Sequence, residues 1–200
     1  MSTRAAAFLD RDGTLIEWIH LLTEAARVRL IAGAAQGVRT LQAAGYRCVV
    51  VTNQSVIGRG MLSEAGLGKI HAEMARQLAA HGCVLDGLYF CPEAPRQEDP
   101  SVLEHPDRKP GPGMLLRAAA ELGLDPSRSW MIGDSLADML AGHNAGCRGS
   151  ILVRTGKGAA VDAAHPAIDH VARDLADAAN WIVSLPAGAL GSRNRAVSDS

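Results

Sequence analysis

The sequence contains few aromatic residues and no marked excess of charge of either sign. Phe, Trp and Tyr make up 4% of the 200 residues, whereas hydrophobic residues make up 48%. This balance favours helices packed on a sheet over an all-β sandwich. The formal net charge of -1 gives no overall field that would attract nucleic acid. We therefore expect an α/β protein without a nucleic-acid partner.

Features of secreted and membrane proteins are missing as well. The four cysteines show no CxxC spacing, which argues against a disulfide framework and fits a reducing compartment. No apolar run is long enough to cross a bilayer, and residues 1–4 lead into a strand-like segment without a charged and then apolar leader. We expect a cytoplasmic protein that has no membrane partner and acts as a monomer.

Short apolar runs alternate with helical patterns along the chain. Strands are expected over 5–9, 47–51, 88–90, 130–132 and 150–153, and helices over 34–44, 63–81, 112–122, 136–144 and 175–184. This alternation predicts a mainly parallel sheet with helices on both faces, a Rossmann-like three-layer sandwich. We expect one domain over residues 1–185, followed by a disordered tail over 186–200 that is rich in Gly, Ser, Arg and Asn.

The strongest local signal is the motif Asp10-Arg11-Asp12-Gly13-Thr14, which begins where the first expected strand ends. Functional sites of parallel sheets assemble at the carboxyl ends of the strands. Two carboxylates two residues apart in an extended segment point the same way and repel each other, unless a cation or different protonation states separate their roles. The motif therefore indicates a divalent-metal site, with a polar turn after a strand as the alternative.

Three further polar clusters follow strands or precede helices. Thr52-Asn53-Gln54 follows the second strand and offers a hydroxyl and amides to phosphate oxygens, although such a tripeptide is also ordinary in turns. Arg108-Lys109 lies just before the helix expected from residue 112, where cations near a helix N-terminus suit an anion; solvated surface charge is the alternative. Asp134 follows the fourth strand and can reach a metal, unless Asp134 or Ser135 only caps the next helix.

In order and spacing, these four clusters resemble the catalytic motifs of the haloacid dehalogenase superfamily. The resemblance covers about residues 5–157, and the short separations between clusters leave no room for a large cap domain. Segments 52–60, 108–115 and 152–157 look more closely like the D-glycero-D-manno-heptose 1,7-bisphosphate phosphatases, with histidinol-phosphate phosphatases as near relatives. The resemblance implies a magnesium-dependent phosphatase that removes the 7-phosphate of the heptose bisphosphate. Histidinol phosphate or another small phosphorylated metabolite stays open as the substrate.

The resemblance also implies a role for each cluster. Asp10 would attack phosphorus to form an aspartyl-phosphate, and Asp12 would act as general acid and then as general base. Mg2+ would bind the Asp10 carboxylate, the Asp12 backbone carbonyl and Asp134. Thr52 and Lys109 would stabilise the transferring phosphoryl group. The residues expected to contact the substrate are Asn53, Gln54, Arg59, Arg108 and Ser135.

Several residues near the motifs are expected to have other roles. Asp138 is expected to orient the site by pairing with Lys109, and His20 is expected to lie at the mouth of the site. His71 is expected to be solvated on its helix. Residues 154–158 are expected to form an ordinary turn, because they lack a complete Walker A pattern.

The segment from 92 to 112 departs from the family pattern. It is rich in Pro, Glu and Asp and lacks apolar periodicity, which predicts a surface loop. Relatives bind a structural zinc there through a Cys-x-His pair and a Cys-x-Cys pair, whereas the corresponding residues here are Cys91, Glu93, His105 and Asp107. One thiolate, one imidazole and two carboxylates are a less thiophilic set. We therefore interpret the segment as a loop that has lost its zinc.

A receiver domain of two-component signalling is the alternative from another functional class. Such a domain also gathers acids, Thr and Lys around magnesium and is phosphorylated on an Asp. Its phospho-acceptor follows a later strand, however, whereas the acid pair here follows the first strand and includes Asp12, the acid and base that a hydrolase needs. The sequence therefore favours an enzyme over a signalling domain or a non-catalytic binding module.

Overall fold

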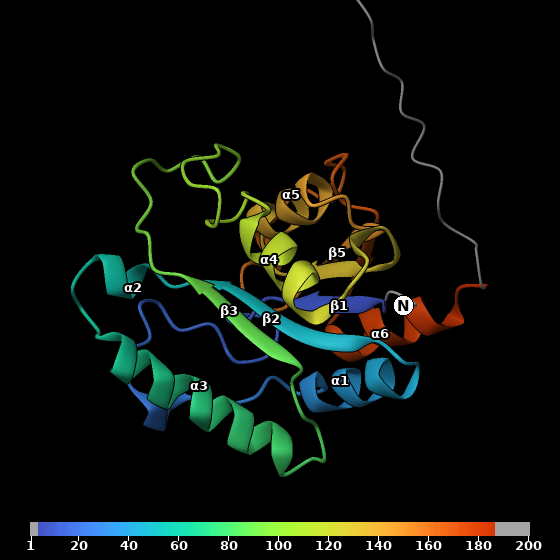
Figure 1. The fold of residues 1–200 in the computed structure, drawn as a ribbon, viewed down its shortest axis with the longest axis horizontal. Coiled ribbons are helices and arrows are strands. Elements are labelled where there is room, and N and C mark those ends of the chain that lie inside the picture. Colours follow the sequence, from blue (N-terminus) through green and yellow to red (C-terminus); the bar gives the residue numbers. More distant parts are fainter. Residues whose placement is uncertain (1–3, 187–200) are drawn as a thin grey trace, which may run out of the picture.

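The structure is a computed structural model that describes residues 4–186. Its strands are β1 (Ala6–Leu9), β2 (Arg47–Asn53), β3 (Gly87–Cys91), β4 (Trp130–Gly133), β5 (Gly149–Val153) and β6 (His170–Ala172). Its α-helices are α1 (Ala34–Ala43), α2 (Ser55–Gly58), α3 (Glu64–Ala79), α4 (Gly113–Leu122), α5 (Leu136–Asn144) and α6 (Leu175–Ser184), as labelled in part in Figure 1. Short 3-10 helices cover Ala25–Arg27, Pro126–Arg128 and Gly158–Ala160.

The described strands form one parallel sheet in the order β3-β2-β1-β4-β5-β6. At its centre, Leu9 of β1 lies opposite Val50 of β2 and Ile132 of β4. Strands β1, β4 and β5 are buried along their whole length, as expected for a parallel sheet that is covered on both faces. The strand order switches direction between β1 and β4, the kind of position where α/β proteins bind ligands.

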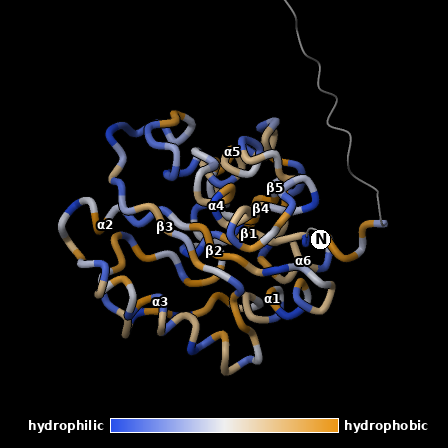
Figure 2. Tube along the Cα trace, viewed as in Figure 1, coloured by the Kyte–Doolittle hydropathy of each residue, from blue (hydrophilic) through white to orange (hydrophobic). Residues whose placement is uncertain are grey.

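Helices cover the sheet as two layers, α1, α3 and α6 on one face and α4 and α5 on the other (Figure 1). Each helical layer packs on the sheet to form a hydrophobic core. Side chains of β1 point alternately to the two faces, so Ala7 and Leu9 lie in the core under α1, α3 and α6, and Phe8 lies in the core under α4 and α5. Hydrophobic and hydrophilic residues alternate along α3 in Figure 2, as expected for a helix with one buried face. The predicted three-layer α/β fold is confirmed.

The expected strands and helices are all present, with ends within two residues of the prediction. The sequence patterns did not predict β6 or the single turn of α2. Strand β6 has three residues, two of them only partly buried, so it shows no apolar run that would reveal a strand. The segment 92–112 contains no helix or strand, as predicted. The predicted disordered tail lies outside the described residues from 187 onward.

None of the helices in residues 4–186 combines the length and the apolar composition that a membrane span requires.

Replacing a buried leucine of α1 tests the assignment of the larger core. Leu41 is fully buried among residues of the sheet, α3 and α6. We expect Leu41→Ala to lower the free energy of unfolding by about 2–5 kcal/mol, because it removes buried apolar surface and leaves a cavity. Val183 of α6 is 44% exposed, and Val183→Ala should change the same quantity by less than about 0.5 kcal/mol. Urea denaturation measures both, and equal effects would contradict the assignment.

Candidate active site

The carboxyl edge of the sheet brings the predicted clusters together. Asp10 follows β1, Thr52 lies near the end of β2, and Asp134 follows β4. Because these strands are neighbours in the sheet, their carboxyl ends open on one edge. Lys109 reaches the same edge from the loop before α4. All four residues line a pocket of about 490 Å³, a volume typical of small-molecule sites.

The Lys109 ammonium lies buried between two carboxylates. Its Nζ is 2.6 Å from Asp10 Oδ1 and 2.5 Å from Asp138 Oδ1, and it also donates to the Val51 carbonyl at 2.8 Å. Burial alone would lower the pKa of Lys109, but Asp10 and Asp138 outweigh it and raise the pKa. Ser135 caps α5, and its hydroxyl donates to Asp138 Oδ2 at 2.6 Å. The predicted pairing of Asp138 with Lys109 is thus confirmed.

Asn53 holds the backbone of Lys109 beside the end of β2. The Lys109 N–H donates to Asn53 Oδ1 at 3.0 Å, and Asn53 Nδ2 donates to the Lys109 carbonyl at 3.0 Å. This reciprocal pair ties the loop before α4 to the end of β2, so the lysine side chain enters the pocket from a fixed backbone. Asn53 was predicted to contact substrate, and it lines the pocket while carrying this positioning role.

Two glycines pack against the carboxylate of Asp134. Gly13 and Gly156 have φ angles of 84° and 55°, and a Cβ at either position would overlap Asp134 Oδ2. The Lys157 N–H donates to that oxygen at 2.7 Å, and Thr155 Oγ1 donates to the Gly13 carbonyl at 2.5 Å. The predicted turn over 154–158 is present, and it also closes one side of the site and fixes Asp134, which the sequence did not predict.

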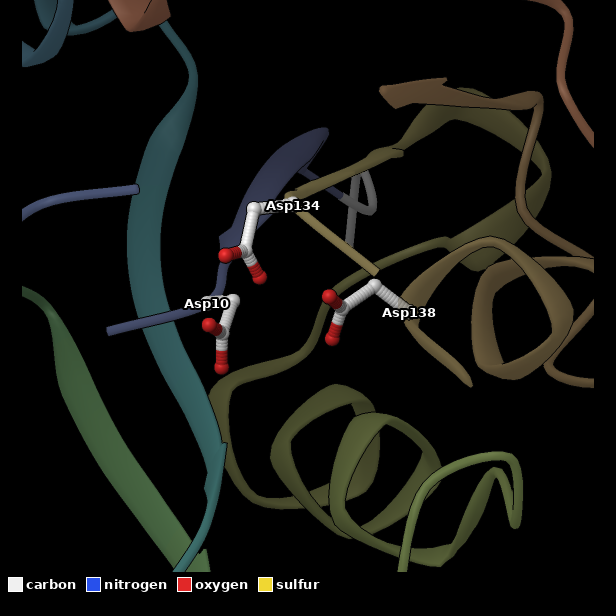
Figure 3. A group of neighbouring side chains, drawn as sticks. All are labelled: Asp10, Asp134 and Asp138. Atoms are coloured by element: carbon white, nitrogen blue, oxygen red, sulfur yellow. The ribbon is translucent and has the colours of Figure 1, made fainter. Parts of the chain in front are cut away.

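Three carboxylates converge at the floor of the pocket. Oxygens of Asp10, Asp134 and Asp138 lie within 4.8 Å of one another, and Figure 3 shows the three side chains next to one another. Burial raises the pKa of Asp10 well above its ordinary value, Lys109 opposes this, and the neighbouring carboxylates reinforce it. Burial and Asp138 raise the pKa of Asp134 to about 7. The raised pKa values of Asp10 and Asp134 indicate that Lys109 alone does not balance the negative charge of the ionised carboxylates.

A divalent cation fits this arrangement. When ionised, the three carboxylates together with Lys109 carry a net charge of -2, which one divalent ion would neutralise. The donors are all oxygens, the ligands that Mg2+ prefers. The two glycines leave room for the Asp134 carboxylate in the cluster. Of the predicted ligands, the Asp10 and Asp134 carboxylates belong to this group. The ligand predicted from Asp12 is its backbone carbonyl, and its carboxylate contacts Arg11 and Gln54.

Comparisons with known proteins identify the family of the chain. A family model described as HAD-hydrolase-like matches residues 107–178. The D-glycero-beta-D-manno-heptose-1,7-bisphosphate 7-phosphatase of Pasteurella multocida is 40% identical over 182 residues, which cover 91% of this chain and 98% of that protein. The chain belongs to this phosphatase family. The D-glycero-D-manno-heptose-1,7-bisphosphate 7-phosphatase of Thermosynechococcus vestitus is 42% identical over 193 residues, covering 90% and 95% of the two chains.

A solved structure supports the same family. The crystal structure of D,D-heptose 1,7-bisphosphate phosphatase from B. bronchiseptica, complexed with magnesium and phosphate, matches with a TM-score of 0.79 and 32% identity. The match covers 90% of this chain and 98% of the other. The fold of the phosphatase is therefore that of haloacid dehalogenase-like enzymes, as the sequence predicted.

All five residues predicted to contact substrate line the phosphatase pocket. Arg59, Arg108 and Ser135 are among them, and His20 lines the pocket too, as predicted. Arg108 is oriented by a hydrogen bond from Nη1 to the Glu93 carbonyl at 2.8 Å. Gln54, the remaining candidate with Asn53, is 4% exposed and directs its amide at Thr52 and Asp12. Substrate contact by these five residues stays a prediction.

The candidate zinc ligands make other contacts. The Asp107 carboxylate pairs with Arg117 at 2.8 Å, and His105 Nδ1 accepts from the Asp107 N–H at 3.1 Å. Burial raises the pKa of the Cys91 thiol, which disfavours the thiolate that zinc binds. Within residues 4–186, Cys91, Glu93, His105 and Asp107 do not form a group whose side-chain atoms lie close enough to share a metal.

Sequence reasoning missed two residues of the phosphatase site. Arg11 is buried within the first motif and pairs with Asp12. His71 was expected to be solvated, but it is partly buried, and its Nε2 lies 3.1 Å from Arg11 Nη1. A second charged residue, two positions after the end of a buried strand, was a signal for Arg11. No local pattern signals His71, because its contact joins residues 60 positions apart.

The raised pKa of Asp134 predicts how the metal-free protein responds to pH. An acid whose pKa is higher in the folded state than in the unfolded state binds more protons when folded, so stability falls as pH rises between the two values. For Asp134 this window runs from about 4 to about 7. In EDTA, we expect thermal stability to fall over this range and to fall less in Asp134→Asn. Identical slopes for the two proteins would contradict the cause assigned to the shift.

Proposed function

We propose that this phosphatase removes the 7-phosphate of D-glycero-D-manno-heptose 1,7-bisphosphate in a magnesium-dependent reaction that passes through an aspartyl-phosphate on Asp10. The observation that carries the proposal is the contact of Asp10 with Lys109 at the floor of the pocket, 2.6 Å apart and next to Asp134. The names of the relatives that are about 40% identical over most of the chain support the substrate.

In the first step, an Asp10 oxygen would attack phosphorus as the ester P–O bond breaks. The electron pair of that bond stays on the leaving sugar oxygen, which takes a proton from Asp12. Lys109 and the Thr52 hydroxyl would stabilise the negative charge of the transferring phosphoryl oxygens. Lys109 suits this role because it is already fixed by Asp10 and Asp138.

In the second step, water would attack the phosphorus of the aspartyl-phosphate. Asp12, now ionised, takes a proton from this water as its oxygen bonds to phosphorus. The bond from phosphorus to Asp10 breaks, its electron pair returns to the carboxylate, and phosphate leaves. The Asp12 carboxylate is 20% exposed, so it is accessible from the pocket.

The residues that would bind magnesium in this scheme already lie close together. Asp10, Asp134 and the Asp12 backbone carbonyl would hold it, with Asp138 beside them. When bound, the ion supplies positive charge to the phosphoryl oxygens and to the carboxylate cluster. Asp138 is satisfied by Lys109 and Ser135, which suits it to orient the lysine.

An aromatic side chain at the pocket mouth favours a sugar substrate. Trp18 lines the pocket and is 42% exposed, and Lys157 Nζ lies 5.1 Å from the centre of its ring. The ring offers an apolar face to the C–H groups of a sugar. The cation beside it favours an anionic group, such as a second phosphate, and disfavours the ammonium group of histidinol phosphate.

Two carboxylates that line the pocket accept hydrogen bonds from residues of their own loop. Asp99 accepts hydrogen bonds from the N–H and hydroxyl of Ser101, and Glu104 accepts from the Arg96 N–H. Arg59 and Arg108 also line the mouth. Together with Lys157, these two arginines offer positive charge to a second phosphate, which supports a bisphosphate substrate.

We also propose that residues 1–185 form one domain that acts as a monomer in the cytoplasm. The described helices pack on a single sheet, which supports one domain. The four cysteines are buried and form no disulfide within residues 4–186, as suits a reducing compartment. Light scattering of the purified protein tests the monomer, and a stable dimer mass would exclude it.

The substrate is tested by comparing phosphorylated compounds in parallel. We expect kcat/KM for the heptose bisphosphate to exceed that for histidinol phosphate by about a hundredfold or more, with phosphate released from position 7. EDTA should abolish turnover and Mg2+ should restore it. Asp10→Asn is the matched control, which should fold but show no turnover. A preference for histidinol phosphate would contradict the proposed substrate.

The loop over 92–112 is proposed to fold without zinc. Glu104 binds the Arg96 N–H at 2.9 and 3.0 Å and lies 3.9 Å from Arg108, and Asp107 pairs with Arg117, so hydrogen bonds and ion pairs hold the loop. We expect elemental analysis of the purified protein to give far less than one zinc per chain. Stoichiometric zinc that survives dialysis would overturn this proposal.

A further inference from the structure

A buried arginine separates the two aspartates of the first motif. Arg11 exposes 1% of its surface. Its Nε lies 3.1 Å from Asp12 Oδ2 and its Nη2 lies 2.9 Å from Asp12 Oδ1. Two parallel contacts of this kind fix both the position and the plane of a carboxylate. Asp12 is therefore held in one orientation by the residue directly before it in the chain.

Gln54 completes the surroundings of the Asp12 carboxylate. Its Oε1 accepts from Arg11 Nη2 at 2.8 Å, and its Nε2 donates to Asp12 Oδ2 at 2.9 Å. The same Nε2 lies 2.9 Å from Thr52 Oγ1. The end of β2 thus helps to hold Asp12, and the position of Asp12 is linked to that of Thr52.

His71 reaches Arg11 from helix α3. Its Nε2 lies 3.1 Å from Arg11 Nη1, and its ring packs against Phe90 of β3 with ring centres 5.9 Å apart. Burial and the charge of Arg11 lower the pKa of His71 to about 4, so the ring is neutral near pH 7. A neutral ring with its proton on Nδ1 can accept a hydrogen bond from Arg11 through Nε2.

A buried guanidinium is costly unless each of its groups finds a partner. Asp12, Gln54 and His71 together occupy Nε, Nη1 and Nη2 of Arg11. If His71 lost its acceptor, the Nη1 group would be left without this partner, and the guanidinium would be free to tilt away from the carboxylate. The imidazole therefore determines how firmly Arg11 holds Asp12.

We propose that Arg11 and His71 are positioning residues that keep the Asp12 carboxylate correctly placed to activate water in the second step of the reaction. The proposal rests on the proposed function, because it assigns Asp12 the role of base. The attacking water must meet the Asp12 oxygen that takes its proton, so the position of that oxygen affects the rate of this step. The pairing should therefore matter most when the aspartyl-phosphate is hydrolysed.

A substrate with a good leaving group separates the two steps. The phenolate of p-nitrophenyl phosphate leaves without needing a proton, so formation of the phospho-enzyme should not depend on how Asp12 is held. Hydrolysis of the phospho-enzyme still requires the base. A defect in positioning should thus lower kcat and KM together and leave kcat/KM unchanged, because kcat/KM reports the first step alone.

Two substitutions of His71 test the proposal with this substrate. We expect His71→Leu, which removes the acceptor, to lower kcat on the order of tenfold. Phospho-enzyme should accumulate in acid-quenched samples, with kcat/KM unchanged. His71→Gln keeps an acceptor and should retain kcat within about threefold of the wild type. His81, exposed just beyond α3, provides a matched control, and His81→Leu should behave as the wild type.

Arg11→Met supplies a second measurement should His71→Leu fail to fold. It keeps the length of the side chain but removes its charge, and it should cause the same accumulation of phospho-enzyme. The proposal is overturned by wild-type kcat in His71→Leu and Arg11→Met, by equal losses of kcat in His71→Leu and His71→Gln, or by a parallel fall of kcat/KM.

Failure of the proposed function would look different. In that case neither the wild type nor Asp12→Ala would form an aspartyl-phosphate. Formation of phospho-enzyme by the wild type, together with wild-type behaviour of the His71 and Arg11 variants, would remove only the positioning roles of these two residues.

Discussion

The buried ion pair between Lys109 and Asp10 is the contact on which the site depends. Lys109 Nζ lies 2.6 Å from Asp10 and 2.5 Å from Asp138. These residues come from the end of β1, the loop before α4 and the first turn of α5, so the contact forms only when α4 and α5 are packed on the sheet. A buried charge without a partner costs several kcal/mol. Folding of the sheet and pairing of the buried charges at the site therefore depend on each other.

The backbone around this ion pair is fixed by contacts that do not take part in the reaction. Asn53 binds both the backbone N–H and the backbone carbonyl of Lys109. Gly13 and Gly156 allow two loops to approach Asp134 closely. Each contact joins the end of one strand to a neighbouring loop. The sheet therefore holds the residues of the site in fixed positions, which favours a fixed arrangement of charges around a phosphoryl group.

The sequence predicted those features that are encoded locally. Apolar periodicity predicted the central strands and the helices that pack on them, and the motif positions predicted that Asp10 and Lys109 would meet. Strand β6 was missed because it is short and lies at the sheet edge. The role of His71 was missed because its contact with Arg11 depends on how α3 lies beside β1 and β3, which no local pattern specifies. The turn around Gly156 was predicted, but its contact with Asp134 was missed for the same reason, since this fit appears only in three dimensions.

The central claim is that Asp10, kept beside Lys109, carries the phosphoryl group during turnover. The most direct test is to quench the enzyme during turnover of the heptose bisphosphate, reduce it with borohydride and identify the modified peptide by mass spectrometry. Borohydride reduces an aspartyl-phosphate to homoserine. The account predicts homoserine in place of Asp10 and unmodified Asp12 and Asp134. Homoserine at another aspartate, or no modified residue in an enzyme that turns over, would contradict it.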